Sequence, residues 1–129
     1  MKKTIAQRLD ERREKSPNPA LYFILYQVVK IIAAPLKVKF IFKARPSEDK
    51  EPFILVSNHA SRVDYVYTAP AVWPRRLNWV VGYNEFFVSP TNIMLRIANV
   101  IPKRNFTPDV HCIQSCKRIL DEGGAICIM

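Results

Sequence analysis

The stretch PFILVSNHASRVD, residues 52–64, decides the fold class of this chain. Pro52 precedes four consecutive apolar residues, and such a short run bounded by turn residues predicts a strand over 53–56 that is buried on both faces. A polar loop follows at once, and we predict a helix from Arg62 to Tyr67, stopped by Pro70 and Pro74. A strand that passes through a short loop into a helix is the repeating unit of an α/β fold.

The sequence on either side of this stretch continues the alternation of strands and helices. On the N-terminal side, residues 36–43 alternate apolar residues with lysines, which predicts a half-buried strand at a sheet edge. We therefore expect an α/β domain with a mixed sheet and helices on both faces. The elements expected toward the C-terminus are strands over 77–81, 100–101 and 125–129, a helix capped by Ser89 that runs to Ile97, and a helix from Asp109 to the pair Gly123-Gly124.

The first 35 residues have a different character. Residues 1–15 are polar and predict a short surface helix, which a proline-containing break at 16–19 ends. Residues 20–36 are almost wholly apolar, with Gln27 and Lys30 on one narrow face of the expected helix. Because Lys30 lies within the run, we predict an amphipathic helix docked in a membrane interface rather than a transmembrane span. A buried core helix of the domain is the alternative.

The composition indicates which partners to expect. The 129 residues include 20 Lys and Arg against 11 Asp and Glu, a formal net charge of +9, which favours anionic partners. The zinc-finger, basic-region and RNA-recognition patterns are absent from the sequence, so we expect no nucleic-acid partner. The charged start and only three cysteines favour the reducing cytoplasm over secretion. We expect a peripheral or monotopic protein at the cytoplasmic face of an anionic membrane.

The loop after the strand at 53–56 carries the candidate catalytic pair. His59 stands in a strand-to-helix loop, and Asp64 follows five residues later in the first turn of the expected helix, from which it can fold back to the imidazole. A carboxylate there fixes the histidine tautomer and steadies the imidazolium, while the other ring nitrogen accepts a proton from an alcohol. The alternative is a local turn in which Asn58 and Ser61 cap the helix and His59 has no chemical role.

The same loop carries a resemblance to a known family. Asn58-His59, four residues and then Asp64, after an apolar strand, resembles the first motif of the glycerophospholipid acyltransferases, including the 1-acyl-glycerol-3-phosphate acyltransferases. Residues 84–87, Asn-Glu-Phe-Phe, resemble the segment before the family's second motif, and residues 100–104, Val-Ile-Pro-Lys-Arg, resemble that motif itself. The resemblance divides the chain into a helical membrane-associating region, 1–35, and the N-terminal part of an acyltransferase domain, 36–129.

The resemblance implies a reaction and its participants. It implies transfer of a fatty acyl group from acyl-CoA or acyl carrier protein, as co-substrate and without a further cofactor, to a hydroxyl of lysophosphatidic acid or glycerol 3-phosphate. His59 is then the general base, Asp64 its partner, and Arg104 the ligand of the acceptor phosphate. The residues implied in substrate binding are Asn58, Ser61, Arg62 and Arg104.

Two further features bear on this expectation. The chain stops at Met129, within a predicted strand after which the family carries a third motif of the Pro-Glu-Gly-Thr-Arg type, so we expect the domain to be incomplete at its C-terminus. A catalytically inactive membrane-binding fragment of the same fold is therefore the alternative function. His111, Cys112 and Cys116 lie close together, but no second cluster supplies further ligands, so we expect thiols and no metal site.

Overall fold

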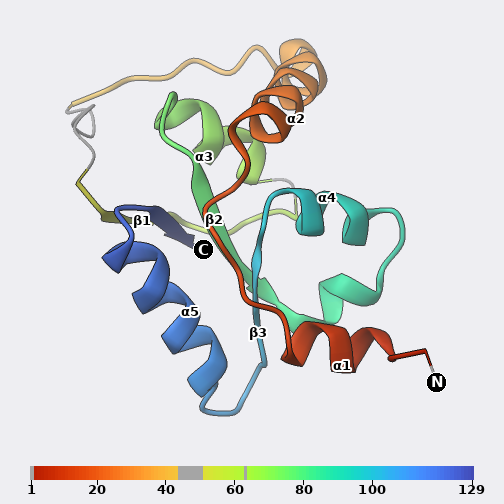
Figure 1. Cartoon of the computed structure of the whole chain (residues 1–129). Helices are drawn as coiled ribbons and strands as arrows, with labels where there is room; N and C mark the ends of the chain where they lie inside the picture. The colour runs from red at the N-terminus through yellow and green to blue at the C-terminus, as the bar shows by residue number, and fades with distance from the viewer. Residues whose placement is uncertain (1, 44–50, 63) are drawn as a thin grey trace.

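The computed structural model describes residues 2–43, 51–62 and 64–129 (Figure 1). Strands and helices alternate from β1 onward, which confirms the α/β class. The α-helices are α1 (Ile5–Asp10), α2 (Pro19–Ala33), α3 (Tyr65–Ala71), α4 (Thr91–Ile97) and α5 (Val110–Asp121), with two 3-10 helices, η1 (Ala34–Leu36) and η2 (Tyr83–Phe87). The strands are β1 (Phe53–Val56), β2 (Leu77–Gly82), β3 (Ile101–Lys103) and β4 (Ala125–Ile128).

The four strands form one parallel sheet in the order β1-β4-β2-β3. The predicted mixed sheet is therefore wrong. Each connection between successive strands contains a helix, and such a crossover returns the chain to the end of the sheet from which the next strand starts in the same direction. As a result, the carboxyl ends of all four strands lie along one edge of the sheet, where open α/β folds place their sites.

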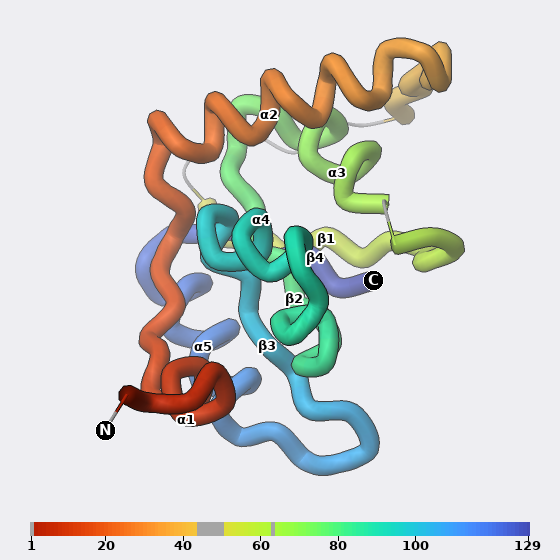
Figure 2. The backbone as a smooth tube through the Cα atoms, turned by 90° about the vertical axis from the view of Figure 1, so that its right-hand side faces the viewer, coloured from red at the N-terminus to blue at the C-terminus, as the bar shows by residue number. Residues whose placement is uncertain are grey.

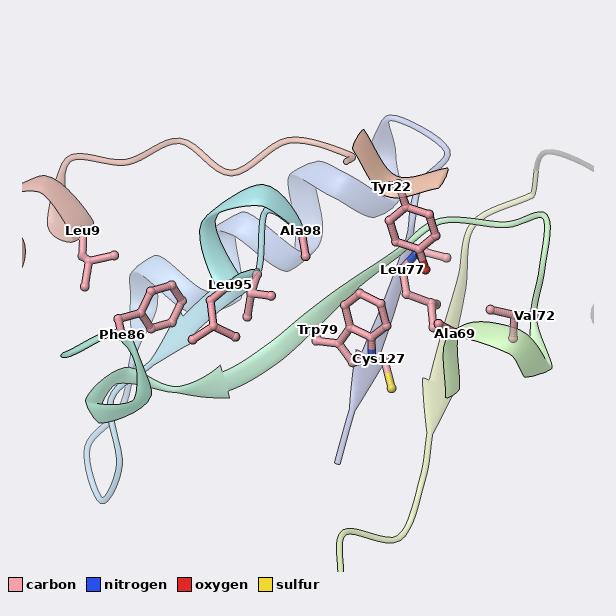
Figure 3. Packing of buried hydrophobic residues seen from close by; sticks show 12 residues of the cluster. Leu9, Tyr22, Ala69, Val72, Leu77, Trp79, Phe86, Leu95, Ala98 and Cys127 are labelled. Atoms are coloured by element: carbon pink, nitrogen blue, oxygen red, sulfur yellow. The ribbon is translucent and has the colours of Figure 1, made fainter. Parts of the chain in front are cut away.

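Helices cover both faces of the sheet, as predicted. On β4, Ala125 and Cys127 face the larger core, whereas Ile126 faces a smaller one. Tyr22 of α2 stacks on Trp79 of β2 within the larger core (Figure 3). The smaller core packs β3 and β4 against α5, and its buried members are Ile101, Cys112, Ile119 and Ile126. This alternation of successive side chains between two cores follows from the pleat of the strand.

The two outer parts of the sheet differ from the prediction. β1 is an edge strand, and Val56 is 75% exposed, so the expectation of burial on both faces is wrong. Residues 37–43 form no strand, although their alternating lysines predict one. Lys37 has a φ of 48°, a left-handed conformation that ends η1 and does not continue as a strand. Period-two patterning therefore did not produce a strand in this segment.

The N-terminal segment is fixed on the domain and does not simply lie on its surface. Leu9 of α1 is buried in the larger core, and Glu14 is completely buried. Asn78 of β2 donates its amide to the carbonyl of Lys15 at 2.8 Å, and Arg118 of α5 donates to the carbonyl of Glu14 at 3.2 Å. These bonds hold the extended residues between α1 and α2 against the domain.

The apolar helix α2 has two different faces. Asn18 caps its first turn through two backbone N–H groups, and Pro19 occupies the first turn. Figure 2 shows α2 crossing over α3 and α4. Its inner side contributes Tyr22, Leu25, Tyr26 and Val29 to the domain. Its outer side exposes Leu21, Phe23, Ile24, Val28, Ile31 and Ile32.

In the described part of the chain, one helical segment, Pro19–Leu36, is long and apolar enough to cross a membrane by length and composition. A membrane-facing role requires that the apolar side chains on the outer side of this segment remain uncovered by protein. The exposed side of α2 meets this condition, whereas the inner side is committed to packing on α3 and α4. The expectation of a helix wholly buried in the core is therefore wrong.

Candidate active site

The candidate pair stands on the loop between β1 and α3. The backbone N–H of Ser57 donates to the carbonyl of Ile128 at 3.1 Å, which extends the pairing of β1 with β4 by one residue. His59 is therefore two residues from a backbone hydrogen-bonded to the sheet. Asp64 occupies the N-cap position of α3, but its side chain caps no N–H of that helix and turns back to the loop.

The Asp64 carboxylate gathers three donors on one oxygen. His59 Nδ1 lies 3.1 Å from Asp64 Oδ2, and the backbone N–H groups of Ala60 and Ser61 donate to the same oxygen at 2.7 and 2.9 Å. The side chain of Asp64 is 12% exposed, whereas that of His59 is 51% exposed. The carboxylate is thus held from within the loop, and the imidazole reaches solvent at the sheet edge.

The same contacts set the charge of the pair. The backbone N–H groups of Ser61 and Ala60, followed by the His59 contact, hold the pKa of Asp64 below its ordinary value, although partial burial opposes them. The ionised carboxylate accepts from His59 Nδ1, so a neutral ring carries its proton on that nitrogen. Nε2 is then left as the acceptor, which is the arrangement that a general base requires.

The other predicted residues of this loop lie around the pair. Asn58, Ser61 and Arg62 are all exposed. Arg62 Nη2 lies 3.6 Å from Glu85 Oε1 of η2, so the loop after β1 and the segment after β2 approach each other at the same edge. Of these residues, Ser61 contacts the pair through its backbone N–H, and Asn58 precedes His59 directly in the chain. Their role in binding stays a prediction.

Arg104 lies at the opposite end of this edge, directly after β3. Its Nη2 contacts Asp10 Oδ1 of α1 at 2.7 Å, and its guanidinium carbon lies 5.4 Å from the centre of the Tyr83 ring. A hydrogen bond with Tyr83 and the charge of Asp10 raise the pKa of Arg104 above its ordinary value. The hollow around it is lined by Leu9, Asp10, Tyr83, Pro102, Arg104, Asp109 and His111.

The pair and Arg104 share the edge but do not meet. They follow β1 and β3, the two outer strands, with β4 and β2 between them. Three strand spacings of about 4.8 Å separate the axes of the outer strands by about 14 Å. A small acceptor that contacts both His59 and Arg104 therefore depends on the reach of the two side chains across the carboxyl ends of β4 and β2.

An apolar pocket beneath α2 was not predicted. Two of its aromatic walls have their polar atoms engaged elsewhere: the Tyr22 hydroxyl accepts from the N–H of Leu77 at 3.2 Å, and Trp79 Nε1 donates to Thr68 Oγ1 at 2.9 Å. The pocket therefore presents carbon to its interior. It is lined by Tyr22, Leu25, Tyr26, Val29, Tyr65, Ala69, Trp79, Val81, Thr91, Met94, Leu95, Ala98 and Val100.

The cysteines are possible metal ligands by residue type. Among the residues that the structure describes, no group of three or more His, Cys, Asp and Glu side chains could hold a metal ion. Cys112, Cys116 and Cys127 are free thiols. Burial raises the pKa of Cys127 to about 11, so this thiol stays protonated at neutral pH.

Comparison with known proteins identifies a protein family. A family model described as Acyltransferase matches residues 37–129. The match contains His59, Asp64 and Arg104, whereas α1 and α2 precede it. Nothing matches the chain among the curated proteins or among the solved structures.

Proposed function

The chain belongs to the acyltransferase family, and we propose that it moves a fatty acyl group from acyl-CoA or acyl carrier protein to a hydroxyl of lysophosphatidic acid or glycerol 3-phosphate. The membership agrees with the sequence resemblance to the glycerophospholipid acyltransferases. The observation that carries the proposal is the 3.1 Å contact between His59 Nδ1 and an Asp64 carboxylate that two backbone N–H groups fix in place.

His59 and Asp64 supply the proton transfer in this reaction. Nε2 of His59 removes the proton of the acceptor hydroxyl as its oxygen attacks the thioester carbonyl carbon, and Asp64 stabilises the resulting imidazolium. The tetrahedral intermediate collapses with cleavage of the carbon–sulfur bond, and the thiol leaves with the proton from His59. The acceptor oxygen is itself the nucleophile, so no covalent acyl-enzyme forms.

Arg104 is the proposed ligand of the acceptor phosphate. A guanidinium presents paired N–H donors that match phosphate oxygens, and Arg104 follows β3 at the same edge of the sheet as His59. Asn58, Ser61 and Arg62 are proposed to bind the substrate near the reacting hydroxyl.

The apolar pocket supports a fatty acyl substrate. Tyr65 directly follows Asp64 in the chain and also lines the pocket, so the pocket and the pair share the start of α3. A wall made almost wholly of carbon favours an alkyl chain over a polar group. We propose that the acyl chain of the donor lies under α2 while its thioester faces His59.

The outer side of α2 supports docking on a membrane. Ile31 is 73% exposed, and five further apolar side chains of α2 are exposed around it. Lys30 and, just beyond the helix, Lys37 and Lys39 are exposed as well, and each basic residue near an anionic leaflet contributes about 1 kcal/mol of attraction. We propose that α2 lies in the interface of the cytoplasmic leaflet, with the site facing a membrane-borne substrate.

The test is thiol release from acyl-CoA with lysophosphatidic acid presented on anionic vesicles. The chain should release thiol and form phosphatidic acid, and the His59→Ala variant should lose about 10²- to 10⁴-fold in rate. Asp121→Asn is the matched control, because it removes an exposed carboxylate that pairs only with Lys117 among the described residues. Equal rates in the His59→Ala and control variants would refute the general-base assignment.

The exposed apolar side of α2 favours one second candidate, a membrane-binding protein of this fold without activity. Salt-sensitive binding to anionic vesicles with no thiol release from any variant would support that candidate.

A further inference from the structure

The carboxylate of Asp10 forms an ion pair with Arg104, whose guanidinium is the proposed ligand of the acceptor phosphate. Arg104 Nη2 and Asp10 Oδ1 are 2.7 Å apart, and the two residues are separated by 94 positions in the chain. Asp10 belongs to α1, which precedes the part of the chain that matches the acyltransferase family. An anion that binds to Arg104 through the same N–H groups has to displace this carboxylate.

The helix itself gives no reason for an acidic residue at this position. Asp10 is the last residue of α1 and Glu11 is its C-cap, and the helix dipole disfavours negative charge at a C-terminus. Glu11 forms an ion pair with Lys3 of the preceding segment. Asp10 instead contacts Arg104, a residue of the candidate site outside α1.

The other carboxylate in the hollow has different partners. Asp109 Oδ2 accepts from the backbone N–H of Arg104 at 2.7 Å, and its Oδ1 caps α5 by accepting from the N–H of Cys112 at 3.0 Å. Asp109 therefore binds backbone and positions the loop. Among the described residues, Asp10 is the carboxylate that forms an ion pair with the Arg104 side chain.

The pair can be exchanged because it is open to solvent. The side chains of Arg104 and Asp10 are 54% and 49% exposed. Exposed ion pairs of this kind are weak, so a phosphate monoester, with a charge near −2 and three acceptor oxygens, can compete for the guanidinium. Leu9, buried in the core, keeps α1 in place while the Asp10 side chain turns away.

We propose that the Asp10 carboxylate competes with phosphate monoesters for Arg104, so that α1 weakens the binding of the acceptor's phosphate. This inference rests on the proposed role of Arg104 in the acyl transfer. Only molecules in which the Asp10–Arg104 pair is open can bind phosphate, so the apparent affinity is proportional to the open fraction. A pair of this strength should therefore weaken phosphate binding about two- to sixfold.

The experiment measures the affinity of the chain for inorganic phosphate and for glycerol 3-phosphate by NMR. The readout is the shift of the Arg104 guanidinium N–H signals, which the Arg104→Gln variant assigns. The Asp10→Asn variant should lower both dissociation constants about two- to sixfold relative to the unsubstituted chain. Asn keeps the size of Asp and removes a charge that the helix terminus disfavours, so α1 should remain folded, as the unchanged signal of Leu9 would show.

Glu11→Gln is the matched control, because it removes the same charge from the same turn without a contact to Arg104. This variant should leave both dissociation constants unchanged. Titration with glycerol, which lacks the phosphate, should leave the Arg104 guanidinium signals in place. Lysophosphatidic acid in micelles, titrated in parallel, distinguishes a membrane-borne monoester from a soluble one.

Equal or weaker phosphate binding in Asp10→Asn, or Arg104 signals that do not move with phosphate, would overturn the inference. The titration requires no turnover, so its result is independent of whether the chain transfers acyl groups. A chain without acyl transfer but with tighter phosphate binding in Asp10→Asn would refute the proposed function alone.

Discussion

The Ser115→Ala substitution tests the anchor that fixes the N-terminal segment on the α/β domain. Ser115 of α5 donates its hydroxyl to Glu14 Oε2 at 2.8 Å, and both side chains are buried. The next nearest side-chain nitrogens, Arg118 Nη2 and His111 Nε2, lie 3.8 and 4.0 Å from the same oxygen. Glu14 Oε1 has no hydrogen-bond partner in the described part of the chain. Loss of the hydroxyl would therefore leave a buried carboxylate without any bond of normal length.

The expected loss in the free energy of unfolding lies in the upper range for a single hydrogen bond. A bond to a charged group contributes about 1.5–3 kcal/mol to the free energy of unfolding. An unfolding entropy of about 2.1 cal/mol/K per residue, over 129 residues, converts this into a Tm lower by about 5–11 °C. Circular dichroism melts and urea titrations of the variant measure both quantities. Ser89 does not cap α4 as predicted, since Pro90 holds the N-cap position and no side chain of the described residues caps the helix. Ser89→Ala, at this exposed serine, is therefore the control and should change the free energy of unfolding by less than about 0.5 kcal/mol. A Ser115→Ala variant as stable as this control would refute the anchor.

Three further outcomes are expected. Cys127, whose pKa burial raises to about 11, should resist a thiol reagent at pH 8 until the chain unfolds, and fast labelling of the native chain would contradict its burial. The pKa of Asp64 in the folded chain lies below its unfolded value of about 3.9. The stability that Asp64 contributes should therefore be complete above about pH 3.9 and should be lost as the pH falls through the lower folded pKa. NMR titration of its carboxyl carbon measures the folded pKa, and a midpoint at or above about 3.9 would be the contrary result. Ile31→Glu on the outer side of α2 should weaken binding to anionic vesicles roughly 10- to 100-fold. Ile113→Glu, at an exposed position of α5, is the control and should have little effect. Equal losses of binding in sedimentation assays would argue against docking through α2.

Local sequence patterns predicted the elements but not their places in the sheet. The apolar run at 53–56 forms a strand, as expected, but its exposure depends on strand order, which places β1 at an edge. Residues 37–43 show the reverse case, because an alternating pattern without a neighbouring strand to pair with forms none. The predicted helix is also shifted along the chain: α3 begins at Tyr65, includes Pro70 and ends at Ala71, before Pro74.

The candidate site divides in the same way between local and distant contacts. The spacing from His59 to Asp64 predicted their contact, because both residues lie on one loop whose ends are fixed by β1 and α3. The contact of Asp10 with Arg104 joins residues 94 positions apart, which no local pattern encodes. The apolar pocket likewise collects side chains from three helices and two strands or their flanks, so its residues carried no common signal in the sequence.

The central claim is that His59 and Asp64 act as one general base, and a double-mutant cycle on kcat/KM for acyl transfer to lysophosphatidic acid tests it most directly. His59→Ala, Asp64→Asn and the double variant are compared with the unsubstituted chain. Residues that act as a unit give non-additive losses, so the double variant should be no slower than His59→Ala alone. Losses that multiply, or near-normal transfer by His59→Ala, would contradict the account.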